Sequence, residues 1–242
     1  MSQDELRFQY PLLALKFPDD ETFASFYPGQ NANLLTQLKN SVVGQGEPVL
    51  YMWGEASSGR SHLLHALCSE VDDRGESVAY IPLSHYQGMT LDIFENMEQV
   101  TLVCIDDVDA IAGNEKWEKA LFDFYNRWSD NKDNRPFGAS LVLCASNLPK
   151  QLDIQLNDLV SRLEWGACYH LSPLNEEDKL GALQLRAQLK GMKLPVDVGR
   201  FLLNRLSRDM NTLLKTLDKL DNASLEAKRK LTIPFVKEVL GL

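Results

Sequence analysis

The sequence predicts an α/β fold, in which a parallel sheet carries helices on both faces, followed by a smaller all-helical domain. Three observations support this. Short, continuous apolar runs alternate with segments of helical periodicity between residues 33 and 171. A glycine-rich loop, GEASSGRSH, joins the first apolar run to a helix. After Pro173 only helical periodicity remains. Continuous apolar strands that alternate with helices are typical of a parallel sheet buried on both faces.

The elements follow in order along the chain. Residues 1–20 are extended in character, because Pro11 and Pro18 break helices. Apolar residues at helical spacing predict a helix over 33–43, which ends at Gly44. The predicted strands are 49–53, 77–81, 101–105, 139–146 and 168–171. The other predicted helices are 61–71, 114–129, 176–190, 196–206, 209–222 and one that begins near residue 234. We therefore expect an extended segment at 1–20, an α/β domain at 21–172 and a helical domain at 173–242.

Composition limits the class of protein. The chain has 242 residues, of which 44% are hydrophobic and 24% are charged, as in ordinary globular domains. No apolar run approaches the roughly 18 residues that a membrane helix needs, and the first residues lack a secretion signal. The net charge is −9 and the pI is about 5.0. Because proteins that grip duplex DNA directly usually carry a basic face, DNA is not the favoured direct partner.

Four cysteines, Cys68, Cys104, Cys144 and Cys168, are widely spaced in apolar contexts, and no C-x-x-C pattern occurs. This argues against a metal site or a disulfide framework. We expect buried free thiols in a reducing cytosol, and hence a cytoplasmic protein.

The glycine loop is close to the phosphate-binding pattern G-x-x-x-x-G-K-[ST]. Gly54 and Gly59 have the required spacing and Ser61 has the hydroxyl that ligates Mg²⁺, but Arg60 replaces the lysine. Backbone N–H groups and a helix N-terminus can bind phosphates without that lysine, whereas hydrolysis needs closer positioning. A chance glycine turn would explain the loop alone equally well. The predicted nucleotide contacts in this loop are Gly54, Ser57, Ser58, Gly59, Arg60, Ser61 and His62.

A second signal favours nucleotide binding. The run LVCIDD places Asp106 and Asp107 at the end of a predicted strand, one strand–helix unit after the loop. In P-loop proteins an acid there holds Mg²⁺, so we assign this role to Asp106, and Asp107 could act as the general base. Two acids that merely cap a strand are the alternative. The two signals together favour a nucleotide site.

Two further signals are weaker singly. Ser146 and Asn147 end the next strand, where a polar side chain often meets the γ-phosphate, although such a pair is also common in turns. Arg162, in the run SRLEWG, lies where an arginine finger would reach a neighbouring subunit's nucleotide. A surface arginine in a salt bridge is the alternative.

These motifs resemble the AAA+ ATPases, specifically the group of the bacterial replication initiator DnaA. The matching runs are ETFASFYPGQNANLL, GEASSGRSHLLHAL, LVCIDDVDAIAG, ASNLPKQL and DLVSRLEWG. The resemblance implies a P-loop α/β lobe and a small helical lid that hold a nucleotide between them, with residues 23–33 near the base. The resemblance does not extend to DnaA's C-terminal DNA-binding domain or to its N-terminal helicase-contact domain. The chain is thus similar to the DnaA-related regulators that inactivate the initiator.

The N-terminal segment resembles a ligand of the DNA polymerase sliding clamp. Gln9 is followed by Leu12, Leu13 and Leu15, so that a glutamine could bond a pocket rim while leucines fill an apolar groove. The alternative is that these leucines pack on the protein's own core. The segment departs from the usual Q-L-x-L-P-L pattern, because leucine is absent at the first following position and proline stands at the second.

The lid departs from DnaA at one position. DnaA carries an arginine in a run of the type V-R-E-L, whereas Asn211 occupies the matching position in MNTL. The loss of a cation that meets the γ-phosphate, together with Arg60, predicts retention of ADP or another nucleoside diphosphate, with Mg²⁺ through Ser61 and Asp106 if it is bound.

Three hypotheses follow. In the first, the protein binds ADP and the DNA-loaded clamp, meets DNA only through that clamp, and presents Arg162 to the ATP of DnaA, which blocks re-initiation. Its own ATPase activity is then small, and a homo-oligomer is left open. The second is a helicase-loader ATPase of the DnaC/IstB type. The third is a non-catalytic adaptor in which Arg162 is dispensable.

Overall fold

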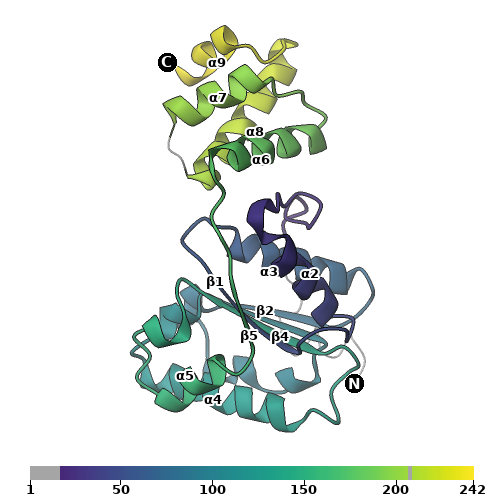
Figure 1. Ribbon diagram of the computed structural model, residues 1–242, viewed down its shortest axis with the longest axis vertical. Helices are drawn as coiled ribbons and strands as arrows, with labels where there is room; N and C mark the ends of the chain where they lie inside the picture. The colour runs from purple at the N-terminus through teal and green to yellow at the C-terminus, as the bar shows by residue number, and fades with distance from the viewer. Residues whose placement is uncertain (1–16, 207–208) are drawn as a thin grey trace. The chain divides into compact units, whose positions relative to one another are not determined.

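The computed structural model describes residues 17–206 and 209–242, and these form two compact units (Figure 1). The first contains residues 17–23 and Asn31–Ser172, and the second contains Ala24–Gln30 and Pro173–Leu242. The change of unit after Ser172 coincides with the change from alternating to purely helical periodicity. The segment Ala24–Gln30, which the sequence grouped with the α/β part, belongs with the helices instead. Its Tyr27 ring packs at Gly181, where a side chain would meet the ring at 2.6 Å.

A five-stranded parallel sheet forms the centre of the first unit. Its strands are β1 (Val49–Trp53), β2 (Val78–Pro82), β3 (Leu102–Asp106), β4 (Ser140–Ala145) and β5 (Ala167–His170), in the order β2-β3-β4-β1-β5. All pairings are parallel. Every residue of β3 and of β4 is buried, which explains their uninterrupted apolar sequences. The predicted fold class and its five strands are confirmed.

Helices cover both faces of this sheet (Figure 1). Helices α2 (Ala32–Ser41) and α3 (Arg60–Asp72) lie on one side, and α4 (Glu115–Asp130) and α5 (Asn157–Leu163) lie on the other. Helix α4 begins where the Asn114 side chain accepts a hydrogen bond from the Trp117 N–H. Its Leu121 and Phe124 are buried in the core of the unit.

Short 3-10 helices occupy several connections of the chain. They are η2 (Gly29–Asn31), η3 (Leu83–Gly88), η4 (Leu91–Phe94), η5 (Met97–Gln99), η6 (Val108–Ile111) and η7 (Pro149–Gln151).

The second unit is built from four further helices: α6 (Glu176–Leu189), α7 (Val196–Arg205), α8 (Met210–Ala227) and α9 (Ile233–Leu240). Asn175, Asp209 and Thr232 cap α6, α8 and α9 through side-chain acceptors. Leucines from α6, α7 and α8 form its core with Phe235 of α9. Within the described part of the chain, no helix has the length and apolarity to cross a membrane.

The prediction of buried thiols holds for three cysteines and is wrong for one. Cys68, Cys104 and Cys144 are buried and free, whereas the free Cys168 is exposed. Cys168 lies on β5, an edge strand in which exposed and half-buried residues alternate. The apolar context did not reveal that β5 is less covered than its neighbours.

Candidate nucleotide-binding site

The carboxyl ends of three adjacent strands bring the predicted motifs together. The strands β3, β4 and β1 are neighbours, and they lead into Asp107, Ser146 and Gly54 respectively. The Gly54 N–H donates to the Ala145 carbonyl of β4 at 3.3 Å, so the loop begins against the adjacent strand. In open α/β sheets, ligands bind outside the carboxyl ends of the strands where the strand order reverses. The sheet thus places the glycine loop at such a point.

The loop from Gly54 to Gly59 has a backbone that needs its glycines. Gly59 has φ +101° and is the N-cap of α3, a conformation that side chains rarely adopt. At Gly54, an added Cβ would lie 2.7 Å from the Leu171 carbonyl oxygen and 2.9 Å from Ser58 Oγ. Ser57 also has a left-handed backbone, with φ +61°. The loop therefore turns its backbone toward the N-terminus of α3, as phosphate binding requires.

Substitution of Gly54 by alanine is expected to lower both the stability and the nucleotide affinity. The clash with Leu171 forces a backbone shift that costs about 3 kcal/mol of unfolding free energy. The same shift would move the loop N–H groups away from the phosphate. Loss of one such hydrogen bond to a charged phosphate would weaken ADP binding by about 10-fold or more. Urea unfolding and calorimetric ADP binding measure the two effects.

Gly166→Ala provides a matched control for that prediction. A Cβ there would also lie 2.7 Å from a backbone oxygen, that of Val49, but away from the loop. This variant should lose stability while the folded protein binds ADP normally. Equal ADP affinities for both variants would contradict the assigned role of the loop.

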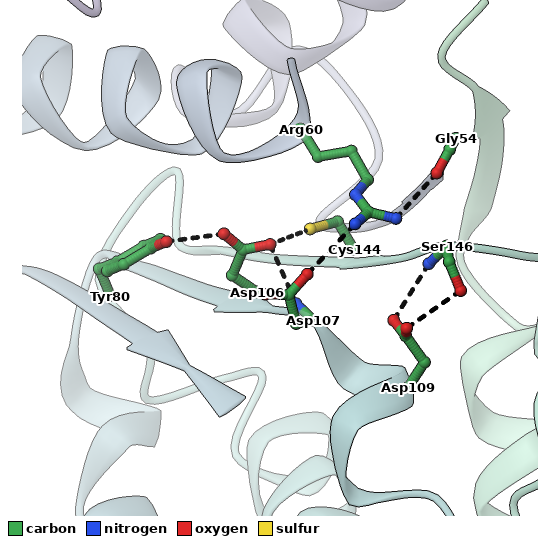
Figure 2. Close-up of polar contacts among 8 residues, drawn as sticks. All are labelled: Gly54, Arg60, Tyr80, Asp106, Asp107, Asp109, Cys144 and Ser146. Carbon is green, nitrogen blue, oxygen red and sulfur yellow. Dashed lines mark hydrogen bonds and ion pairs between the residues drawn. The ribbon is translucent and has the colours of Figure 1, made fainter. Parts of the chain in front are cut away.

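Arg60 is held by the protein itself (Figure 2). Its Nη1 donates to the Gly54 carbonyl at 2.8 Å, and its Nη2 forms an ion pair with Asp107 Oδ1 at 3.2 Å. The forked guanidinium makes both contacts at once, whereas a lysine ammonium is a single point charge. The cation that replaces the P-loop lysine therefore joins the first residue of the loop to the acid after β3.

Asp106 is a buried carboxylate whose two oxygens both accept hydrogen bonds (Figure 2). Oδ2 accepts from the Tyr80 hydroxyl at 2.6 Å. Oδ1 accepts from the Cys144 thiol at 2.7 Å and from the Asp107 N–H at 2.9 Å. Burial first, and then the charge of Asp106, raises the pKa of the Tyr80 hydroxyl, which therefore remains a donor. These contacts fix the orientation of the carboxylate.

Asp107 follows in a left-handed backbone conformation, with φ +53°. Burial of its carboxyl group raises the pKa of Asp107, and the neighbouring Asp106 charge adds to this, while a Ser84 hydrogen bond and Arg60 act in the opposite direction. A raised pKa is common for a group that accepts protons in a site. Its assignment as a general base stays a prediction.

The end of β4 is held by residues that the sequence analysis did not select. The Asp109 carboxylate accepts hydrogen bonds from the Ser146 N–H and the Ser146 hydroxyl, both at 3.0 Å (Figure 2). The buried Tyr51 of β1 donates to the Asn147 carbonyl at 2.8 Å. Together these contacts position the Ser146–Asn147 turn. The third acid of the run DDVD was the available signal for Asp109.

The two histidines of α3 face the segment that precedes α2. His62 Nε2–H donates to the Thr22 carbonyl at 2.9 Å, and His65 Nδ1–H donates to the Glu21 carboxylate. The described residues contain no cluster of histidine, cysteine and acidic side chains able to hold a metal. A nucleotide contact by His62 stays a prediction.

We expect the stability to fall as the pH drops below about 6.5, the ordinary pKa of histidine, because of His62. Burial lowers the pKa of His62 in the folded protein. The unfolded chain therefore binds more protons than the folded chain in this range, and protonation favours unfolding. His62→Gln keeps a donor for Thr22 but cannot titrate. Urea unfolding of both proteins from about pH 5 to 8 should show a steeper acidic loss for the wild type, and parallel curves would contradict the assignment.

Arg162 lies in the last turn of α5, and its guanidinium sits 4.4 Å above the ring centroid of Trp165. Trp165 is 71% exposed. Within residues 17–206 and 209–242, no carboxylate forms an ion pair with Arg162. Among the described residues, Arg162 is therefore not a surface arginine held in a salt bridge.

A buried acid that the sequence analysis missed sets the start of α5. The Glu118 carboxylate, on α4, accepts hydrogen bonds from the Gly113, Gln155 and Leu156 N–H groups at 2.7–3.1 Å. Leu156 is the N-cap residue of α5. Glu118 thereby positions the helix that carries Arg162. A lone glutamate on an amphipathic helix gave no signal for this role.

The remaining predicted residues lie elsewhere. Asn211 is in the first turn of α8 and belongs to the second unit. The residues predicted to bind the clamp, Gln9, Leu12, Leu13 and Leu15, lie outside the described residues. Of the segment 23–33, Ala24–Gln30 groups with the helical unit. Its proximity to a nucleotide base stays a prediction.

The loop residues fit a bound phosphate. Ser58 Oγ is buried and has no hydrogen-bond partner among the described residues, in a loop where a Cβ at Gly54 would collide. A buried hydroxyl of this kind needs a partner. Mg²⁺ is usually held by one or two carboxylates together with substrate phosphates, so Asp106 and Ser61 suit it only alongside a nucleotide.

The five-stranded parallel sheet with its glycine loop and strand-end acids, followed by a helical domain, is the fold of the AAA+ class. The sequence model of the bacterial DnaA ATPase domain matches residues 18–170, and that of the Hda lid domain matches residues 176–240. The chain belongs to the bacterial DnaA ATPase family, as an Hda-like, DnaA-related protein.

Solved structures share this fold. Domain III of the Thermotoga maritima replication initiation protein DnaA is 22% identical, with a TM-score of 0.76, and the match covers 94% of this chain and 98% of that one. AMPPCP-bound DnaA from Aquifex aeolicus is 22% identical, with a TM-score of 0.67 over 84% of this chain and 65% of that one. A Thermotoga maritima RuvB mutant is 14% identical, with a TM-score of 0.68 over 93% and 72%.

Proposed function

We propose that this protein is a nucleotide-binding regulator that stimulates hydrolysis of the ATP bound to DnaA. The result is inactivation of the initiator and prevention of re-initiation. Membership of the DnaA family and the Hda-type lid support this class of activity. The observation that carries the proposal is the environment of the Arg162 side chain. It is held against an exposed tryptophan and has no internal ion pair within the described residues, so its charge is available to an external phosphate.

The proposed ligand of the chain itself is ADP or another nucleoside diphosphate. The Ser58 hydroxyl, which has no hydrogen-bond partner among the described residues, and the left-handed Gly59 at the start of α3 support a phosphate site. The DnaA of Aquifex aeolicus binds AMPPCP, a nucleotide analogue, in the same fold. Arg60 is engaged with Asp107 and the Gly54 carbonyl, which supports slow hydrolysis in this site. Asp106 and Ser61 would hold Mg²⁺, which would neutralise phosphate charge.

The proposed second partner is the DNA polymerase sliding clamp. Its support is the sequence of the segment from Gln9 to Leu15, and through the clamp the protein would reach DNA despite its net charge of −9. Such a location on replicated DNA would place the chain in the cytoplasm near DnaA.

Hydrolysis of DnaA-bound ATP in the presence of clamp loaded on DNA tests the proposal. Gln9→Ala should weaken clamp binding about fivefold, because it removes one hydrogen bond of about 1 kcal/mol. The variant should then stimulate hydrolysis poorly at limiting clamp and normally at high clamp concentration. Gln3→Ala, in the same segment, serves as the matched control. Wild-type rates for Gln9→Ala at limiting clamp would contradict the proposed docking.

A further inference from the structure

Residues 17–22 pack directly on α3. Glu21 accepts a hydrogen bond from His65, and the Thr22 carbonyl accepts one from His62. The Phe17 ring lies 5.8 Å from the His65 ring, measured between centroids. The hydrogen bond from His65 is the main reason why the pKa of Glu21 is lowered, so the carboxylate form is favoured. This segment is thus fixed to the helix that follows the glycine loop.

The same histidine contacts the strand that faces Asp106. The His65 ring meets the Tyr80 ring edge-on, with centroids 4.6 Å apart, and Phe17 meets Tyr80 edge-on at 6.3 Å. The Tyr80 hydroxyl then donates to Asp106 Oδ2 at 2.6 Å. Contacts therefore run without a gap from Glu21 through His65 and Tyr80 to Asp106.

Tyr80 determines the orientation of one carboxylate oxygen. Asp106 Oδ1 is held by Cys144 and by the Asp107 N–H, whereas Oδ2 faces Tyr80. Hydrogen bonds to a charged acceptor are among the strong ones, and here the acceptor is buried. A displacement of the Tyr80 ring would rotate or release the carboxylate that the proposed function assigns to Mg²⁺. Such outer partners commonly tune the affinity of a metal site.

We propose that Tyr80 and His65 are positioning residues that couple residues 17–22 to the metal-dependent part of nucleotide binding. The inference rests on the proposed function, since it takes Asp106 as the Mg²⁺ residue. Residues 17–22 directly follow the segment proposed to bind the clamp, so the coupling joins the two functional parts of the chain. Coupling of this kind is reciprocal.

The test is the ADP dissociation constant measured with and without Mg²⁺, expressed as the gain in affinity that Mg²⁺ produces. Tyr80→Phe removes only the hydroxyl, and Glu21→Gln weakens the contact that holds His65. Each should reduce the gain by about 3- to 10-fold, which corresponds to part of a hydrogen bond to a charged group. The double variant should lose no more than Tyr80→Phe alone, because both act along one chain of contacts.

Tyr125→Phe is the matched control, because Tyr125 is a buried tyrosine on α4 that no contact above involves. Urea unfolding of each variant verifies that it is folded. The inference is overturned if the Mg²⁺-dependent gain in ADP affinity of Tyr80→Phe stays within twofold of the wild-type gain, or exceeds it. So does a double variant whose loss is the product of the two single losses. A wild type with no Mg²⁺-dependent gain would instead remove the proposed metal role of Asp106, and this inference with it.

Discussion

Replacement of Arg162 by alanine is expected to lower the stimulated hydrolysis of DnaA-bound ATP by at least about 10³-fold, the effect typical of an arginine finger. The guanidinium would stabilise charge that develops on the γ-phosphate in the partner's site, where a positioned cation acts most strongly in the transition state. Arg162 can serve this role because its described contact is the Trp165 ring rather than a carboxylate. The measurement is single-turnover hydrolysis of ATP preloaded on DnaA.

Lys150→Ala is the matched control for Arg162→Ala. Lys150 is an exposed cation of the same unit, 74% exposed, and it pairs with Glu164 at 2.9 Å. Its loss removes one positive charge without removing the proposed finger, so hydrolysis should stay near the wild-type rate. Clamp binding should be unchanged in both variants. If DnaA-bound ATP is hydrolysed as fast in the presence of Arg162→Ala as in the presence of Lys150→Ala, the regulator is a non-catalytic adaptor.

Replacement of Glu118 by alanine is expected to produce the largest loss of stability, about 4 kcal/mol. The buried carboxylate accepts from three backbone N–H groups, and each orphaned buried donor costs about 1–3 kcal/mol. Two of these groups belong to Gln155 and Leu156, immediately before α5. The folded variant should therefore also stimulate DnaA less well, because the helix that carries Arg162 loses its anchor.

Glu115→Ala on the same helix is the control, since Glu115 is exposed in the first turn of α4. It should change the unfolding free energy by only a few tenths of a kcal/mol, the usual scale for a surface substitution. Urea unfolding compares the two variants directly. If the unfolding free energies of Glu118→Ala and Glu115→Ala differ by less than about 1 kcal/mol, the three N–H groups must find other partners.

The fold could be predicted because each strand and most helices show their own pattern of apolar residues in the sequence. Each of the five strands is a short apolar run, and burial on both faces explains why β3 and β4 contain no alternation. Helix α5 was missed because it has only 7 residues, too few for periodicity to show. Helix α8 runs to Ala227, beyond the predicted end, because residues 223–227 form helix without a strong apolar period.

The candidate site could be predicted only in part. Motif spacing indicated the loop and the pair Asp106–Asp107, since the carboxyl ends of adjacent parallel strands meet at one edge. The hydrogen-bond partners of the Arg60 guanidinium, the Tyr80 hydroxyl and the Glu118 carboxylate could not be predicted. Their partners are 47, 26 and up to 38 residues away in the sequence. Such pairings depend on the assembled tertiary structure, which local patterns do not encode.

The central claim is that hydrolysis occurs in the partner's site rather than in this chain's own. The most direct measurement uses ATP labelled in the γ-phosphate, placed either on DnaA or on this protein before the two are mixed with clamp on DNA. We predict that labelled phosphate is released when the label starts on DnaA, and that release requires Arg162. Steady release of label from this protein alone, without DnaA, would contradict the claim and favour a loader-type ATPase.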